Sequence, residues 1–112
     1  MEIIGDAGRF TPSAAQAGNH WIEQFRAADL SVGTYSIPSG GIDDQEPHTE
    51  DEIYVVTAGR AVLWAGRQSA AVGPGSVIYV AAGEEHRFTD VAEDLAAIVL
   101  FAPAEGARSP TG

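Results

Sequence analysis

Cysteine is absent from this chain of 112 residues, and basic residues are scarce. Without cysteine no disulfide can supplement the hydrophobic core, and the composition fits a reducing compartment. The 6 basic residues are all arginine and stand against 16 acidic ones, which gives a formal net charge of -10. A surface of that sign repels the phosphates of nucleic acids and of anionic lipids. We therefore expect neither a nucleic-acid partner nor a membrane partner.

Long apolar runs are missing as well. The longest candidate, residues 95–103, has the length of a strand and is far too short for a membrane span. The first ten residues show no basic segment followed by an apolar run, which is the pattern of a secretory signal. We expect a cytoplasmic protein.

What the chain does contain is the composition of one small globular domain, with 45% hydrophobic and 20% charged residues. No stretch keeps a helical period. Short apolar segments rich in β-branched and aromatic residues alternate with glycine and proline turns, which predicts an all-β fold, an antiparallel sandwich or barrel. The expected strands are 21–26, 30–37, 52–57, 61–64, 76–80, 86–89 and 95–101.

The organisation expected from these segments is an N-terminal arm over residues 1–20, a β-barrel domain over 21–103 and a flexible C-terminal tail over 104–112. The arm has room for one short strand. A core of this size is often supplemented by oligomerisation or by a bound metal.

Two histidines and two glutamates are candidates for a divalent-metal site. His48 lies just before an expected strand, and alternation puts Glu52 and Tyr54 on one face of that strand. Glu46 shares a face with His48 if the segment is extended, and His86 opens a later strand. Imidazoles and carboxylates that converge inside a barrel would suit a first-row divalent ion.

The same pattern also has an ordinary interpretation. Six carboxylates fall within ten residues, and most are expected to belong to a solvated acidic loop. They are Asp43, Asp44, Glu46, Glu50, Asp51 and Glu52. A histidine beside such a loop is more often an ordinary surface or core residue than a metal ligand. The residues alone leave both interpretations open.

Two spaced motifs make the chain resemble the cupin superfamily. Gly40, five residues, Glu46, one residue, His48, three residues, Glu52, six residues and Gly59 reproduce the first cupin motif. Glu46 stands where most of the family has a histidine.

The second motif follows in the same register. It runs from Gly75 through five residues to Ala81-Ala82-Gly83, then two residues to His86 and three more to Asp90. Ala81 replaces the usual proline and Asp90 the usual asparagine. The resemblance spans about residues 30–102 and implies a small double-stranded β-helix, also called a jelly roll, usually a homodimer, with a metal inside the barrel.

Carried over residue by residue, the resemblance implies a metal site of Glu46, His48, Glu52 and His86. Two carboxylates would neutralise a divalent ion, so Mn(II) or Fe(II) is favoured, with Zn(II) or Ni(II) possible. The expected function is a metal-dependent enzyme, an oxygenase, isomerase or lyase, acting on a small organic substrate. The alternative is a module that binds a small molecule without catalysis, with or without metal.

Residues around the implied site follow from alternation along the same strands. Tyr54 and Phe88 should point the same way as Glu52 and His86, and the Tyr54 hydroxyl is the candidate catalytic group. The remaining aromatics are expected to line the cavity or to fill the core; they are Tyr35, Trp64 and Tyr79. Asp90 either accepts a hydrogen bond from a ligand histidine or lies in solvent. His20 is expected at the surface or at an interface.

Overall fold

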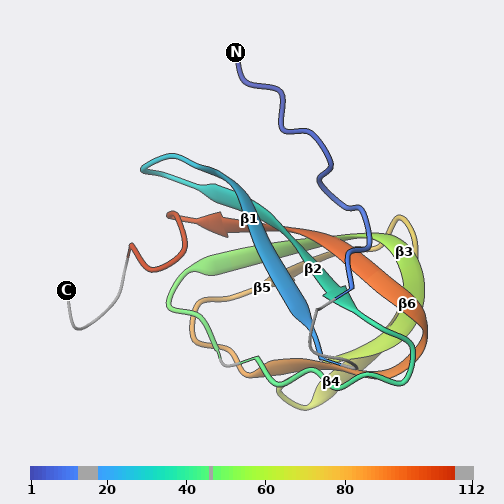
Figure 1. The fold of residues 1–112 in the computed structure, drawn as a ribbon. Coiled ribbons are helices and arrows are strands. Elements are labelled where there is room, and N and C mark those ends of the chain that lie inside the picture. The colour runs from blue at the N-terminus through green and yellow to red at the C-terminus, as the bar shows by residue number, and fades with distance from the viewer. Residues whose placement is uncertain (13–17, 46, 108–112) are drawn as a thin grey trace.

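The computed structural model describes residues 1–12, 18–45 and 47–107, and these form an antiparallel β shell that curls around one core (Figure 1). The strands are β1 (His20–Arg26), β2 (Ser31–Ile37), β3 (Asp51–Ala65), β4 (Gln68–Val72), β5 (Val77–Val80) and β6 (His86–Ala102). The described residues contain no helix, so the all-β prediction is confirmed. None of them therefore supplies a helix long and apolar enough to cross a membrane.

Two long strands, β3 and β6, pair with each other at the centre of the sheet. β6 pairs with β3 along almost its whole length and with β2 along its second half. The strand order is β1-β2-β6-β3-β4, and β5 pairs with β3. Because β3 and β6 both curve, each contributes residues to opposite walls of the interior (Figure 1).

The sequence predicted separate strands over 52–57 and 61–64, and the structure joins them into β3. Pairing with β6 shifts register three times between Val56 and Val62. Gly59, at the centre of this irregular stretch, has φ of 83°. A Cβ built there would lie 2.3 Å from the Asp94 carbonyl oxygen. The glycine therefore marks a bend in a continuous strand and not a turn between two strands.

The same correction applies to β6, which joins the predicted segments 86–89 and 95–101. β4 was not predicted at all. Its residues are mostly small, and four of the five are exposed. It forms because residues 68–72 pair with residues 61–65 of β3 across a turn that contains Gly66, so backbone hydrogen bonds and not burial hold it in place.

Of the predicted N-terminal arm, residues 1–12 contain no strand and contact the sheet at Gly8 and Thr11, whereas His20 already begins β1. The Gly8 amide donates to Thr34 Oγ1 at 2.8 Å, and Thr57 Oγ1 donates to the Gly8 carbonyl at 2.6 Å. The Thr11 amide donates to Ser36 Oγ at 3.0 Å. These contacts cover Thr34 and Ser36, which alternate with the core residues Tyr35 and Ile37, so β2 is buried on both faces there.

The interior is built from the alternating positions that the sequence predicted. Tyr54 and Phe88 are buried on the same side as Glu52 and His86, as expected. The Tyr54 and Phe88 rings meet edge to face, with centroids 5.0 Å apart. The remaining members of the core come from β2, β3, β5 and β6 and include Tyr35, Ile37, Val56, Leu63, Val80, Leu95, Val99 and Phe101.

Two of these aromatic residues lie outside the core. Trp64 is 44% exposed and Tyr79 is 60% exposed, so neither fills the core. Tyr79 faces outward because it alternates with the inward-facing Val80 and Ile78 on β5. Tyr35 alone of the three is buried.

Candidate functional site

Glu52 and His86 meet in the interior although their backbones pair elsewhere. Glu52 pairs with Phe101 and His86 with Ala65, so the curl of β3 and β6 is what brings the two side chains together. The distance from His86 Nε2 to Glu52 Oε1 is 3.1 Å. The side chains are only 1% and 3% exposed respectively. The pair is therefore a buried imidazole–carboxylate contact.

His86 is oriented from both edges of its ring. Its Nδ1 lies 2.9 Å from the Glu84 carbonyl, and its Nε2 lies 2.9 Å from the Tyr54 hydroxyl. Burial lowers the pKa of His86, but hydrogen bonds to Glu52 and to the Glu84 carbonyl outweigh it and leave the pKa raised. In the metal-free protein these acceptors favour a ring with a proton on each nitrogen.

Tyr54 contributes a protonated hydroxyl beside this pair. Its oxygen lies 3.0 Å from Gln45 Oε1, to which it donates. Burial, and then the charge of Glu52, raise the pKa of Tyr54 well above its ordinary value. The phenol therefore stays neutral and can act as a hydrogen-bond donor inside the barrel.

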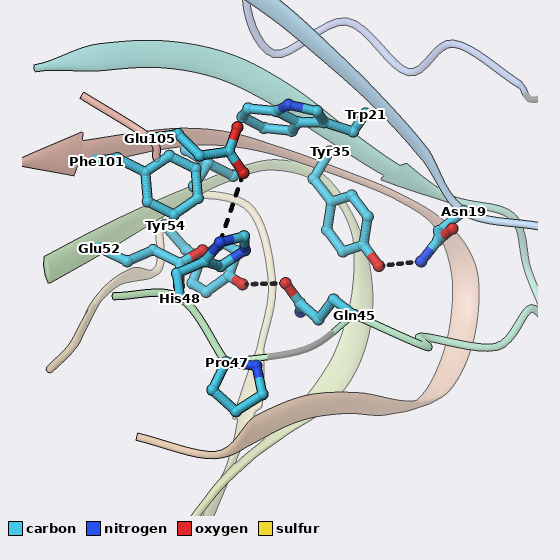
Figure 2. Close-up of a pocket in the computed structure, with 11 residues that line it drawn as sticks. Asn19, Trp21, Tyr35, Gln45, Pro47, His48, Glu52, Tyr54, Phe101 and Glu105 are labelled. Atoms are coloured by element: carbon cyan, nitrogen blue, oxygen red, sulfur yellow. Dashed lines mark hydrogen bonds and ion pairs between the residues drawn. The ribbon is translucent and has the colours of Figure 1, made fainter. Parts of the chain in front are cut away.

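A cavity of about 400 Å³ opens next to these groups (Figure 2). His48 lies on its wall, with Nδ1 3.5 Å from Glu105 Oε2 and its ring centroid 4.5 Å from that of Phe101. The backbone carbonyl of His48 accepts a 2.7 Å hydrogen bond from the Gly83 amide. The full lining is Asn19, Trp21, Tyr35, Gln45, Pro47, His48, Glu52, Tyr54, Val99, Phe101 and Glu105.

The structure describes three of the four predicted metal ligands. Glu52 and His86 touch, and His48 lines the same cavity as Glu52. Glu46 lies outside the described residues. Among residues 1–12, 18–45 and 47–107, no three histidine or acidic side chains are grouped closely enough to hold a metal ion.

The distance within the Glu52–His86 pair gives a test of whether the two donors fit one ion. Ligands lie about 2.1 Å from Mg²⁺ in near-octahedral geometry, so two adjacent ligands at a right angle are about 3.0 Å apart. The 3.1 Å separation matches that value. The pair therefore fits two adjacent ligands of one octahedral divalent ion.

Asp43 is a site residue that sequence reasoning missed. It was counted in the acidic loop, yet it is only 1% exposed. Its carboxylate accepts hydrogen bonds from Tyr35 Oη at 2.5 Å, the Phe88 amide at 2.8 Å and Gln45 Nε2 at 2.8 Å. The backbone amide of Gln45 also donates to this carboxylate, at 3.2 Å. Asp43 thereby fixes Gln45, which in turn holds the Tyr54 hydroxyl.

The network continues from Asp43 to Asn19, which also lines the cavity. Asn19 Nδ2 donates to the Tyr35 hydroxyl and, at 2.7 Å, to Asp44 Oδ1. Burial and the neighbouring Asp43 raise the pKa of Tyr35, so this phenol is also neutral. The acidic loop is therefore solvated in part only, because Asp43 and Glu50 are buried.

A second hollow of about 500 Å³ reaches His86 from another side. It shares Gln45 and Pro47 with the first cavity. Trp64 lines it and donates from Nε1 to Thr89 Oγ1 at 3.1 Å. Gly66, Glu85 and Arg87 complete the lining together with His86 and Thr89.

Two further candidates lie away from the cavities. His20 begins β1, its Nδ1 lies 3.2 Å from the Thr11 carbonyl, and it lines neither hollow. Asp90 is exposed, adopts a φ of 51°, and accepts a 3.4 Å hydrogen bond from Thr89 Oγ1.

Comparison with known proteins bears on the family. The Cupin domain family matches residues 33–103. An uncharacterized protein of Streptomyces coelicolor is 41% identical over 85 residues, which covers 76% of this chain and 81% of that protein.

Solved structures with a similar fold are more distant in sequence. The TT1209 protein of Thermus thermophilus matches with a TM-score of 0.71 at 21% identity, covering 93% of this chain and 97% of its own. KdgF from a Halomonas species matches with a TM-score of 0.71 at 18% identity, covering 81% and 85%. The DMSP lyase DddQ of Ruegeria pomeroyi matches with a TM-score of 0.69 at 22% identity. That match covers 75% of this chain and 46% of DddQ.

These structures show the fold, and the family match covers both motifs. The register of the two motifs, the curled antiparallel sheet and the match over residues 33–103 agree with one another. The chain belongs to the Cupin domain family.

Proposed function

We propose that this cupin is a metal-dependent enzyme that binds a small organic substrate in the 400 Å³ cavity. The reaction classes are those expected from the resemblance, namely oxygenation, isomerisation or lyase chemistry. The observation that carries the proposal is the buried Glu52–His86 contact, which has the separation of two adjacent metal ligands and lies beside the Tyr54 hydroxyl. Cavities of this size suit small ligands.

In this proposal Glu52 and His86 hold the ion together with His48 and Glu46. The ion, with Mn(II) or Fe(II) favoured, would supply a Lewis acid that polarises an oxygen of the substrate. The Glu84 carbonyl accepts from His86 Nδ1 and so keeps Nε2 directed at Glu52. Metal binding at Nε2 would displace the proton that this nitrogen carries in the metal-free protein.

The role proposed for Tyr54 is to donate a hydrogen bond to the substrate, in place of the bond that it donates to Gln45. Its hydroxyl is neutral, buried and held between Gln45 and His86, so the position of its oxygen is fixed before a substrate arrives. A preorganised donor in a low-dielectric cavity stabilises developing negative charge better than water does. That DddQ, a protein of similar fold, is a DMSP lyase supports an enzymatic role without carrying its substrate over.

Metal analysis tests the proposal directly. Protein purified without added metal and then loaded with Mn²⁺ or Zn²⁺ should retain about one equivalent after gel filtration. His86→Ala and Glu52→Ala should each lose most of it, because each removes half of the buried pair. His20→Ala is the matched control, since His20 lines neither cavity, and it should keep the full equivalent. Full metal content in both His86→Ala and Glu52→Ala would refute the ligand assignment.

A non-catalytic binding role is the second candidate, and the cavity wall favours it. Trp21 and Phe101 pack edge to face at 5.8 Å and line the cavity with Tyr35. Such aromatic walls bind small organic molecules without needing a reaction. Ligand binding that is equally tight with and without metal, and no turnover with either, would favour this second role.

We also propose a homodimer through the outer face of β5 and β3, defined by Ile53, Val55, Val77 and Tyr79. Ile53 pairs with Tyr79 and Val55 with Val77, so the four side chains form two adjacent rows. Val77 is 67% exposed, and these four residues carry no charge on a protein of net charge -10. A second copy can cover this face without bringing like charges together, and its own apolar rows match it.

Sedimentation velocity tests the dimer. The unaltered protein should sediment as a dimer, and Val77→Glu should sediment as a monomer because it puts like charges into the twofold interface. Leu30→Glu is the control, since Leu30 is also exposed but lies in the β1–β2 turn. A dimer that persists in Val77→Glu, or an unaltered protein that is monomeric, would overturn this face as the interface.

A further inference from the structure

Glu105 lines the cavity although it follows both motifs in the sequence and lies beyond the family-matched residues 33–103. The segment that carries it is held to β2. Its own amide donates to Ser31 Oγ at 2.9 Å, and the preceding Ala104 is buried. The Ala107 amide donates to the Ala104 carbonyl at 2.9 Å, which closes a turn around Glu105. The backbone therefore presents this side chain to the cavity in a defined position.

The side chain that Glu105 meets is His48. Glu105 Oε2 lies 3.5 Å from His48 Nδ1, and Figure 2 shows this contact. Both side chains are about a quarter exposed. The Phe101 ring packs against the imidazole with a centroid distance of 4.5 Å and an interplanar angle of 60°. Glu105 and Phe101 together limit how the His48 ring can rotate.

His86 provides the comparison within the same barrel. Its Nδ1 lies 2.9 Å from the Glu84 carbonyl, and its Nε2 points at Glu52. An acceptor at Nδ1 holds the ring proton on that nitrogen and leaves the lone pair of a neutral imidazole on Nε2. Glu105 approaches the same ring nitrogen of His48 that the Glu84 carbonyl approaches on His86, at 3.5 Å and not at 2.9 Å.

We propose that Glu105 is a positioning residue that keeps the His48 proton on Nδ1 and turns Nε2 toward the ion held by Glu52 and His86. The inference rests on the proposed metal site and extends it to the C-terminal segment. A carboxylate placed behind a ligand histidine raises the basicity of the ring and fixes its orientation, and its removal typically weakens metal affinity about 10- to 100-fold.

Calorimetric titration of the metal-free protein with Mn²⁺ or Zn²⁺ tests this coupling. Glu105→Ala should weaken binding about 10- to 100-fold in the unaltered background. It should have no further effect in the His48→Ala background, because the residue through which it acts is gone. Glu93→Ala is the control for the change in net charge, since Glu93 is exposed and pairs with Arg60. It should leave the affinity unchanged.

The outcomes separate the inference from the proposed function. If His48→Ala and His86→Ala weaken binding but Glu105→Ala does not, Glu105 has no positioning role and the metal site stands. An equal loss from Glu105→Ala in both backgrounds would also overturn the inference, because Glu105 would then act independently of His48. If neither histidine affects metal binding, the proposed function fails.

A measurement without metal then tests Glu105 by itself. Nitrogen-15 NMR of the metal-free protein at a pH where His48 is neutral should show the proton of His48 on Nδ1. Glu105→Gln should shift the tautomer population toward Nε2–H, because the amide group lacks the negative charge that holds the proton at Nδ1. A His48 that is already protonated on Nε2 in the unaltered protein would overturn the inference.

Discussion

The Asp43 carboxylate ties three parts of the fold together, so its replacement by asparagine is an informative perturbation. Its Oδ1 accepts hydrogen bonds from Tyr35 Oη and from the backbone amide of Gln45. Its Oδ2 accepts hydrogen bonds from the backbone amide of Phe88 and from Gln45 Nε2. Asparagine keeps one acceptor oxygen and replaces the other with a donor. Whichever way the amide is turned, two donors lose their acceptor.

The expected cost follows from these two lost hydrogen bonds. Hydrogen bonds to charged groups contribute about 1.5–3 kcal/mol each, so two of them give about 3–6 kcal/mol. Removing a carboxylate that is only 1% exposed returns part of its desolvation energy, which places the result near the lower end. We expect Asp43→Asn to lower the free energy of unfolding by about 3 kcal/mol, a large share of the 5–15 kcal/mol typical of a domain.

Urea denaturation followed by tryptophan fluorescence measures this loss, with the m-value compared between variants. Asp44→Asn is the matched control. Asp44 is the next residue, is exposed, and is bonded to Asn19, so its replacement should cost less than about 0.5 kcal/mol. If Asp43→Asn costs less than about 1 kcal/mol, or no more than Asp44→Asn, the carboxylate does not anchor this part of the barrel.

Two other predictions concern pH and the bend in β3. The folded protein raises the pKa of Tyr35, so the Tyr35 hydroxyl keeps its proton at a pH where the unfolded chain loses it. An unfolded tyrosine loses its proton above pH about 10, so the free energy of unfolding should fall as the pH rises beyond that value. The slope contributed by Tyr35 is about 1.4 kcal/mol per pH unit and should be absent from Tyr35→Phe in urea denaturation at stepped pH; equal slopes in both proteins would contradict it. Gly59→Ala should cost about 2–3 kcal/mol, because the added Cβ meets the Asp94 carbonyl at a positive φ. Gly66→Ala, at a positive φ with open space around it, should cost about 1 kcal/mol, and equal losses at the two positions in thermal denaturation would refute the role of close approach.

The parts of the fold that sequence predicted are those governed by local alternation. Glu52, Tyr54 and Phe88 face inward because successive side chains of a strand point to opposite sides. The bend at Gly59 could not be told from a turn, since the same glycine serves either and only pairing with β6 distinguishes them. β4 was missed because its stability comes from partners elsewhere in the chain and not from its own residues.

The site was predictable to the extent that motif spacing defines it. The spacing indicated Glu52 and His86, and the structure brings them into contact. It gave no signal for Asp43, because a buried loop carboxylate has the same sequence signature as its solvated neighbours. Glu105 was missed for a related reason, since it enters the cavity through the path of the chain after β6.

The way β3 and β6 curl has a consequence for how the domain folds. His86 and Tyr54 are 32 residues apart in sequence, and no local segment can bring them together before the shell closes. Contacts of such long separation make folding slow, because chain entropy is lost before the contacts form. An ion bridging Glu52 and His86 would bind the folded protein in preference to the unfolded chain, and would therefore slow unfolding. The metal-loaded protein should then unfold more slowly in denaturant than the metal-free protein does.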